Sequence, residues 1–185
     1  MVQEMIAYCD SDWAGDESDS KSTSGYVITL ADGPIVWRST KQTSVSKSST
    51  EAETAAADAC LEDIFWCRDM LKFFGFNQPT PTKLYMDNEA AIGSIRRGNT
   101  TQRNKYFRVR IDALHDAYND KIIEVTHMRT DLLPADAFTK SLSGPQLLKH
   151  KEKLNIRKVH NMHTKKEGVE IMGCPPCAVD AVKSD

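Results

Sequence analysis

The feature that most constrains this chain is a run of helix-forming residues, SSTEAETAAADACLEDIFWCRDMLKFFG, which extends from Ser48 to Gly75. Ala, Glu, Leu and Lys have high helix propensity, the apolar side chains recur with a helical period, and Gly commonly ends a helix. We therefore predict one long helix over residues 48–75. The segments before and after it have different patterns, and their order indicates the fold class.

Strand-like and helix-like segments flank this long helix. Residues 4–9 are predicted to form one strand, and residues 24–39 two strands joined by a turn at Asp32, Gly33 and Pro34. The chain therefore opens with three antiparallel strands. After Pro81 the elements alternate, with a strand at 83–87, helices at 88–98 and 105–119, a strand at 121–128 and a short helix at 133–142. This order is typical of an α/β domain.

Length and composition are those of one globular domain with an extension. The chain has 185 residues, of which 40% are hydrophobic and 27% are charged, so it can bury one ordinary core. After Pro145 the sequence is rich in Lys and His, which is typical of a poorly packed tail. We therefore assign residues 1–145 to the α/β domain and residues 146–185 to a basic, partly disordered extension.

Charge, hydropathy and cysteine content limit the classes of partner. The formal net charge is −2, so any contact with nucleic acid has to come from local basic patches. No apolar run reaches the roughly 20 residues that cross a bilayer, and no signal-peptide pattern is present, so we expect a protein that is not secreted and has no membrane partner. Cys9, Cys60 and Cys67 lie in apolar surroundings, which indicates buried free thiols.

Acidic residues recur at the ends of the predicted elements, at positions 10, 51, 53, 87 and 136. Functional groups of α/β sheets gather at strand ends and helix N-termini, so these carboxylates could converge. Each close pair would repel by about 4 kcal/mol at an effective dielectric near 20, and a bound metal would offset that repulsion. Oxygen ligands suit Mg²⁺ or Mn²⁺, and a pair of such ions is typical of phosphodiester cleavage.

Simpler interpretations compete with this one. DSDWAGDESDSK, from Asp10 to Lys21, resembles the opening of a calcium-binding loop, but Lys21 stands where a bidentate Glu is required. Thr50 with Glu53, and Ser48 with Glu51, match helix-capping boxes. Residues 87 and 136 could act only as a turn residue and a helix-start charge. The tail motifs HNMH and CPPC could bind zinc, although the two His are closely spaced.

Three blocks of the sequence resemble the ribonuclease H domain at the C-terminal end of copia-type LTR retrotransposon Pol polyproteins: YCDSDWAGDESDSKSTSGYVITLADGPIVWRSTKQTSVSKSSTEAE, LYMDNEAAI and HMRTDLLPADAFTKSL. The resemblance runs over about residues 5–143. It implies a ribonuclease H-like α/β fold, in which helices flank a five-stranded mixed sheet whose first three strands are antiparallel. It also implies a metal-dependent endonuclease that hydrolyses the RNA strand of RNA/DNA hybrids during reverse transcription.

By this resemblance, the catalytic and metal-binding residues are Asp10, Glu53, Asp87 and Asp136, with Glu51 as second choice for the helix Glu. The implied cofactors are two Mg²⁺ ions, for which Mn²⁺ can substitute. Asp10 is implied to bridge both ions, Asp136 to help hold the ion that activates water, and Glu53 and Asp87 to hold the ion at the leaving 3′ oxygen. His127, at the end of the last strand, is a further candidate for assisting product release.

The implied substrate is an RNA/DNA hybrid. We expect contacts with its 2′-hydroxyls from the polar residues Thr40, Gln42, Ser48 and Ser49. Basic residues would hold the phosphates or form an ordinary charged surface: Lys41, Lys47, Arg96, Arg97, Arg103, Lys105, Arg108 and Arg110. The reverse transcriptase domain of the same polyprotein is an expected partner, and a cytoplasmic virus-like particle with nuclear access is the expected location.

Two features depart from the family pattern. KYFRVRID, at 105–112, replaces a block that usually contains His, Ile and Asp followed by Arg, Tyr and His, and Thr54 stands where a Tyr is expected. Neither change touches the four acidic positions. Their retention favours an enzyme over the alternative, a catalytically decayed or repurposed module that binds the hybrid without cutting it.

Overall fold

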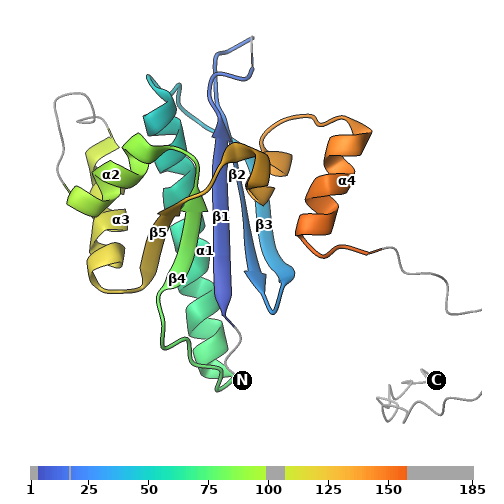
Figure 1. Ribbon diagram of the computed structural model, residues 1–185. Coiled ribbons are helices and arrows are strands. Elements are labelled where there is room, and N and C mark those ends of the chain that lie inside the picture. The colour runs from blue at the N-terminus through green and yellow to red at the C-terminus, as the bar shows by residue number, and fades with distance from the viewer. Residues whose placement is uncertain (1–3, 17, 99–106, 158–185) are drawn as a thin grey trace, which may run out of the picture.

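The computed structural model describes residues 4–16, 18–98 and 107–157, which form a five-stranded sheet with helices (Figure 1). The elements follow in the order β1 (Met5–Asp12), β2 (Thr23–Leu30), β3 (Gly33–Lys41), α1 (Ser49–Phe73), β4 (Thr82–Met86), α2 (Glu89–Arg97), α3 (Arg108–Asn119), β5 (Ile123–His127), the 3₁₀ helices η2 (Thr130–Leu132) and η3 (Pro134–Phe138), and α4 (Gly144–Lys153).

The sheet has the strand order β3-β2-β1-β4-β5. β2 pairs antiparallel with β1 and β3, whereas β4 pairs parallel with β1 and β5. The mixed sheet with three antiparallel first strands is therefore confirmed. Because β1 and β4 are parallel, their C-terminal ends lie at the same edge of the sheet, where α1 also begins (Figure 1).

The core lies between the sheet and α1. Alternate residues of β1, among them Ala7 and Cys9, are fully buried, as are Ala56, Cys60 and Ile64 of α1. Small side chains on this face of α1 let the helix approach the sheet closely. The free thiols of Cys9, Cys60 and Cys67 are buried, which confirms the prediction for these three cysteines.

Local differences from the prediction have clear causes. The hairpin between β2 and β3 turns at Ala31 and Asp32, which have φ values of 53° and 61°, and Gly33 already belongs to β3. Two left-handed residues match the right-handed twist of a two-residue hairpin. The segment after Leu133 forms a short 3₁₀ helix rather than ten helical residues.

The predicted boundary at residue 145 falls inside a helix. α4 spans Gly144–Lys153, begins with a capping box between Ser143 and Gln146, and contacts η3. His150 and Leu154 are buried, whereas Leu147 and Leu148 are exposed, so the part of the predicted extension up to residue 154 is helical and partly packed. Residues 158–185, with HNMH and CPPC, lie outside the described part of the chain.

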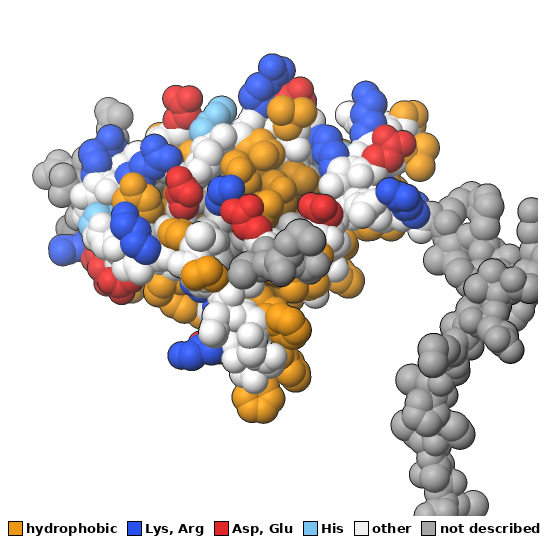
Figure 2. Space-filling view, turned by 60° about the horizontal axis from the view of Figure 1, so that its bottom comes forward, with side chains coloured by type: hydrophobic (Ala, Val, Ile, Leu, Met, Phe, Trp, Pro, Cys, Tyr) orange, Lys and Arg blue, Asp and Glu red, His pale blue; other side chains and the backbone are white. Residues whose placement is uncertain are grey.

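Large apolar side chains are exposed around the C-terminal end of α1: Phe65, Trp66, Phe73, Phe74 and Phe76. Figure 2 shows hydrophobic side chains gathered on this side of the molecule.

Within the described ranges, no helix is long and apolar enough to cross a membrane.

Candidate metal centre

Asp10 lies toward the C-terminal end of β1, the central strand, at the end of the sheet where α1 begins. It pairs in register with Gly25 of β2, and only 4% of its surface is exposed. The hydroxyl of Thr139, directly after η3, donates a hydrogen bond to Asp10 Oδ2 at 2.8 Å. The strand therefore continues past its apolar half because a polar group from a distant segment satisfies the buried carboxylate.

Glu53 lies near the start of α1 and is also 4% exposed. Its Oε1 accepts hydrogen bonds from the backbone N–H and the hydroxyl of Ser11, at 3.0 and 2.9 Å. Its Oε2 is buried and has no hydrogen-bond partner among the described residues. A buried oxygen without a partner is costly in an isolated protein and is typical of a position that binds a ligand.

The second acidic residue of this turn, Glu51, has a different role. Ser48 is the N-cap and accepts a hydrogen bond from Glu51 N at 3.2 Å, while Glu51 Oε2 accepts one from Lys47 N at 2.8 Å. Glu51 therefore stabilises the helix start, and Glu53 is the helix Glu that faces Asp10. The two residues diverge because positions two apart on a helix point in nearly opposite directions.

Asp87 directly follows β4. Its Oδ2 accepts a hydrogen bond from the Thr130 hydroxyl at 2.7 Å. The N-cap of α2 is the next residue, Asn88, whose side chain accepts a hydrogen bond from Ala91 N at 3.0 Å. Asn88 therefore caps α2, and Asp87 is not needed for this role.

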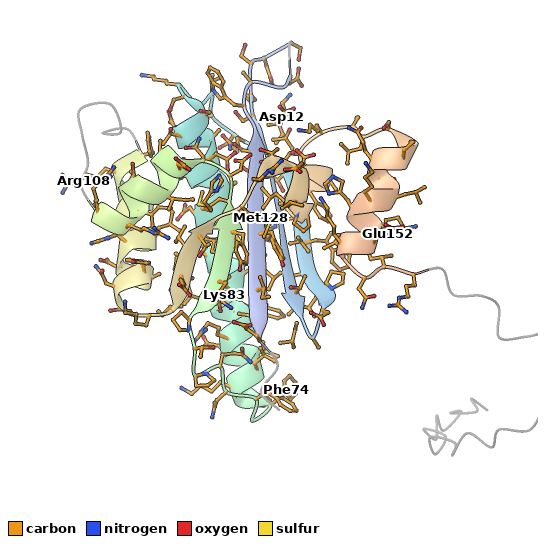
Figure 3. The ribbon with its side chains drawn as sticks, viewed as in Figure 1. Asp12, Phe74, Lys83, Arg108, Met128 and Glu152 are labelled. Atoms are coloured by element: carbon orange, nitrogen blue, oxygen red, sulfur yellow. The ribbon has the colours of Figure 1, made fainter. Side chains whose placement is uncertain are left out.

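Three of the four predicted carboxylates meet. One oxygen each from Asp10, Glu53 and Asp87 lie within 4.8 Å of one another. Asp12, two residues beyond Asp10, lies at the same upper edge of the sheet, and Lys83 and Phe74 lie toward the opposite end (Figure 3). We call Asp10, Glu53 and Asp87 the acidic triad.

Asp136 lies in η3 beside the triad but outside it. Its side chain is 11% exposed, Oδ1 lies 2.5 Å from Lys140 Nζ, and Oδ2 lies 3.8 Å from His150 Nε2 of α4. Asp136 is close enough to raise the pKa of Asp10 through its charge. The structure thus separates the four acids into the triad and one carboxylate with its own cation.

The triad is electrostatically strained in the absence of a cation. Burial, together with the charges of Asp87 and Asp136, raises the pKa of Asp10 to about 6, although the Thr139 hydrogen bond opposes this shift. Burial, with the charges of Asp10 and Asp87, raises the pKa of Glu53 to about 8. The residues present fit a divalent metal, because they supply converging oxygen ligands of the kind Mg²⁺ and Mn²⁺ prefer.

A close approach of η3 to β2 positions the second half of the site. A Cβ atom on Gly25 would lie 2.7 Å from Thr139 Cγ2 and 2.9 Å from the Phe138 backbone carbon. Only glycine leaves room for η3 to pack against the sheet beside Asp10. η3 carries Asp136, and Thr139 follows it directly, so Gly25 positions both.

The residues predicted to contact substrate differ in their surroundings. Thr40 and Ser49 are exposed. Gln42 donates to Ser24 Oγ and Ala52 O, at 2.8 and 3.0 Å, and accepts from the Ser46 hydroxyl at 2.7 Å. Gln42 and the N-cap Ser48 thus brace the loop that leads into α1, and substrate contact by these four residues stays a prediction.

Several predicted basic residues form contacts within the protein. Arg110 pairs with Asp58 at 3.4 Å, Arg108 with Asp112 at 3.3 Å, and Arg96 donates to Val125 O at 2.5 Å. Lys41 pairs with Asp16 and Asp19. Arg103 and Lys105 lie outside the described residues.

His127 lies at the exposed end of β5, opposite Met86 in register. It lines a shallow surface depression with Arg129, Thr130 and Asp131. Because Thr130 also holds Asp87, this depression adjoins the triad.

Sequence reasoning missed the residues that surround the acids: Ser11, Thr130 and Thr139, which donate hydrogen bonds to them, and Lys140 and His150, which lie beside Asp136. Position along the chain could have suggested some of them. Ser11 adjoins Asp10, and Thr139 and Lys140 follow Asp136 in ADAFTK. Thr130 and His150 carry no such signal, because only the fold brings them to the site.

Solved structures establish the class of this fold. The protein named LC11-RNase H1, isolated from compost, superimposes with a TM-score of 0.58 at 17% identity, over 75% of this chain and 94% of that one. The N-terminal RNase H domain of rv2228c from Mycobacterium tuberculosis gives a TM-score of 0.53 at 12% identity, over 81% of this chain and 97% of that one. The chain has a ribonuclease H-like fold.

Sequence relatives specify the domain further. The chain is 31% identical over 155 residues to the retrovirus-related Pol polyprotein from transposon RE1 of Arabidopsis thaliana, a match of 84% of this chain and 11% of the relative. It is 33% identical over 136 residues to the Pol polyprotein from transposon TNT 1-94 of Nicotiana tabacum. This match covers 74% of this chain and 10% of that relative. No family model matches. The chain is a relative of transposon Pol polyproteins, as predicted, and spans about a tenth of their length.

Proposed function

We propose that this domain is a metal-dependent endonuclease that hydrolyses the RNA strand of RNA/DNA hybrids during reverse transcription of a copia-type retrotransposon. The observation that carries the proposal is the convergence of Asp10, Glu53 and Asp87 within 4.8 Å, with Glu53 Oε2 buried and unpartnered among the described residues. The relatives from transposons RE1 and TNT 1-94 are Pol polyproteins, and LC11-RNase H1 has been solved in complex with an RNA/DNA hybrid, which supports this choice of substrate.

The proposed metal ligands are the acidic triad and Asp136, and the proposed ions are two Mg²⁺, replaceable by Mn²⁺. Bound divalent cations in such sites activate water and stabilise the leaving oxygen. The chain's own contribution is to orient the carboxylates: Ser11 holds Glu53, Thr139 holds Asp10, and Thr130 holds Asp87. These hydrogen bonds restrict each acid to one orientation before the substrate arrives.

Substrate recognition is proposed to involve the segment between β3 and α1. Thr40, near the end of β3, and Ser49, the first residue of α1, flank this segment and are exposed, and polar groups that reach consecutive 2′-hydroxyls distinguish RNA from DNA. A reverse transcriptase domain of the same polyprotein is the proposed partner, and a cytoplasmic virus-like particle with nuclear access is the proposed location.

The test is cleavage of an end-labelled RNA/DNA duplex by the purified chain in Mg²⁺, compared with EDTA. We expect wild-type protein to cut the RNA strand, Asp10→Asn to abolish cutting, and Glu4→Gln, an acid paired with Lys83 toward the opposite end of the sheet, to leave it unchanged. Asn is nearly isosteric with Asp and removes a buried charge, so circular dichroism should show a folded Asp10→Asn protein.

Two outcomes would contradict the proposal. One is the absence of cutting by well-folded wild-type protein at high concentration. The other is equal cutting by wild type and Asp10→Asn. Tight, metal-independent binding of the hybrid without cutting would favour the alternative of a repurposed binding module.

A further inference from the structure

The four acids of the site carry unequal counter-charges. Among the described residues, none of Asp10, Glu53 and Asp87 forms an ion pair with a Lys or Arg side chain. Asp136 has Lys140 Nζ 2.5 Å from Oδ1. The ammonium group forms an ion pair with this carboxylate, whose Oδ1 is buried and has no hydrogen-bond partner among the described residues, and its charge opposes the approach of a metal ion to Asp136. The triad and Asp136 therefore present different surfaces to an incoming cation.

The position of Lys140 is imposed by its neighbours. Thr139, the preceding residue, is buried and donates its hydroxyl to Asp10 Oδ2 at 2.8 Å, which fixes the end of η3 against β1. The close packing over Gly25 holds the same segment from the side. The backbone at residue 140 is thus anchored, while the Lys140 side chain remains 45% exposed. Because its backbone is anchored and its side chain is half exposed, Lys140 can place its ammonium group beside Asp136 or turn it into solvent.

From this arrangement we propose that Lys140 is an internal competitor for the metal position at Asp136, so that the site loads its two ions in order. The first ion binds the acidic triad with Lys140 still on Asp136, and the second binds only when the Lys140 ammonium moves away. The inference rests on the proposed function, because it assumes that the triad binds a divalent ion. Lys140 is a positioning residue here, since it acts through Asp136.

The magnitude follows from the exposure of the pair. If the ion pair between Lys140 and Asp136 must be broken before the second metal ion binds, the affinity for that ion falls about fivefold. Removing the charge of Lys140 should therefore strengthen the second binding event by roughly that factor and the first one by less, because Lys140 acts on Asp10 of the triad only through its charge and forms no ion pair with it. Arg keeps the charge and can still reach a carboxylate, so Lys140→Arg should keep the second event weak.

The test is calorimetric titration of the full chain with MnCl₂ after EDTA treatment, without nucleic acid. We compare wild type with Lys140→Met, Lys140→Arg and the control Lys83→Met, which removes a lysine that pairs with Glu4 at 2.8 Å, far from the site. The expected result is one tight and one weak event in the wild type, and a selectively tighter second event in Lys140→Met alone. Melting temperatures in EDTA check that all variants are folded.

Each outcome decides something distinct. Equal tightening of both events, no change in Lys140→Met, or the same change in Lys83→Met would overturn the role of Lys140 while leaving the metal site intact. If the wild type shows a single Mn²⁺-binding event, the appearance of a second binding event in Lys140→Met supports the inference. A single binding event in Lys140→Met as well would refute it. If wild type binds no Mn²⁺, or Asp10→Asn binds it equally well, the metal site itself is wrong and the inference falls with it.

Discussion

Replacing Glu53 with Gln should make the metal-free protein more stable at alkaline pH and leave it unchanged at acidic pH. Burial and the neighbouring carboxylates raise the pKa of Glu53 from 4.5 to about 8. Because the folded-state pKa lies above the unfolded value, this residue's contribution to stability is fully present below pH 4.5 and is lost as the pH rises through about 8. Gln does not titrate and can still accept both hydrogen bonds from Ser11.

The size of the effect follows from linkage. Between pH 5 and pH 8, ionisation of Glu53 should remove about 3 to 4 kcal/mol from the free energy of unfolding. For a chain of this length, that corresponds to a melting temperature lower by about 6–16 °C. Glu53→Gln should recover most of this loss at pH 8. The raised pKa of Asp10 acts in the same direction, so some pH dependence should remain in the variant.

The assay is urea or thermal unfolding of wild type, Glu53→Gln and the control Glu51→Gln, in EDTA, at pH 5 and pH 8. Glu51 caps the same helix turn from its outer side, so Glu51→Gln should show the pH dependence of the wild type. MgCl₂ should stabilise the wild type at pH 8 more than it stabilises Glu53→Gln. If wild type and Glu53→Gln lose the same free energy between the two pH values, the burial argument for Glu53 is wrong.

Two further predictions concern the contact between η3 and the sheet. Gly25→Ala should lower the free energy of unfolding by about 1–3 kcal/mol, because the added methyl group would overlap Thr139 and Phe138; a urea midpoint equal to that of wild type would contradict this. Thr139→Val removes the hydrogen bond to Asp10, which should cost about 1 kcal/mol and raise the pKa of Asp10 further above its ordinary value. NMR titration of the Asp10 carboxyl measures that shift, and an unchanged pKa would refute the role of Thr139.

Much of the fold follows from local patterns in the chain. The long helix begins after Ser48 and carries Glu53 on the same face as Ala56, Ala57 and Cys60, at the helical spacings of three, four and seven residues. This periodicity agrees with Glu53 facing the sheet, whereas the choice of Glu53 over Glu51 came from the family resemblance. Local pattern succeeds here because helix geometry determines which side chains share a face.

The motif resemblance identified the acidic positions, but not their surroundings. Asp10, Glu53 and Asp87 meet because β1 and β4 are parallel and α1 begins at the same edge of the sheet. Strand order could not be derived from the element order, since many arrangements satisfy the same local propensities. The boundary predicted at residue 145 falls inside α4 for the same reason, because the contacts between α4 and η3 form only in the folded chain.

The amino-acid sequence by itself indicated most of the strands and helices, the three buried cysteines and the four acidic candidates, because each depends on local spacing or on a contiguous motif. Only the tertiary structure decided that three acids share one point and that Asp136 faces Lys140 and His150 instead. The physical reason is that electrostatic and packing contacts between residues such as Thr139 and Asp10, 129 positions apart, depend on chain topology, which no short segment encodes.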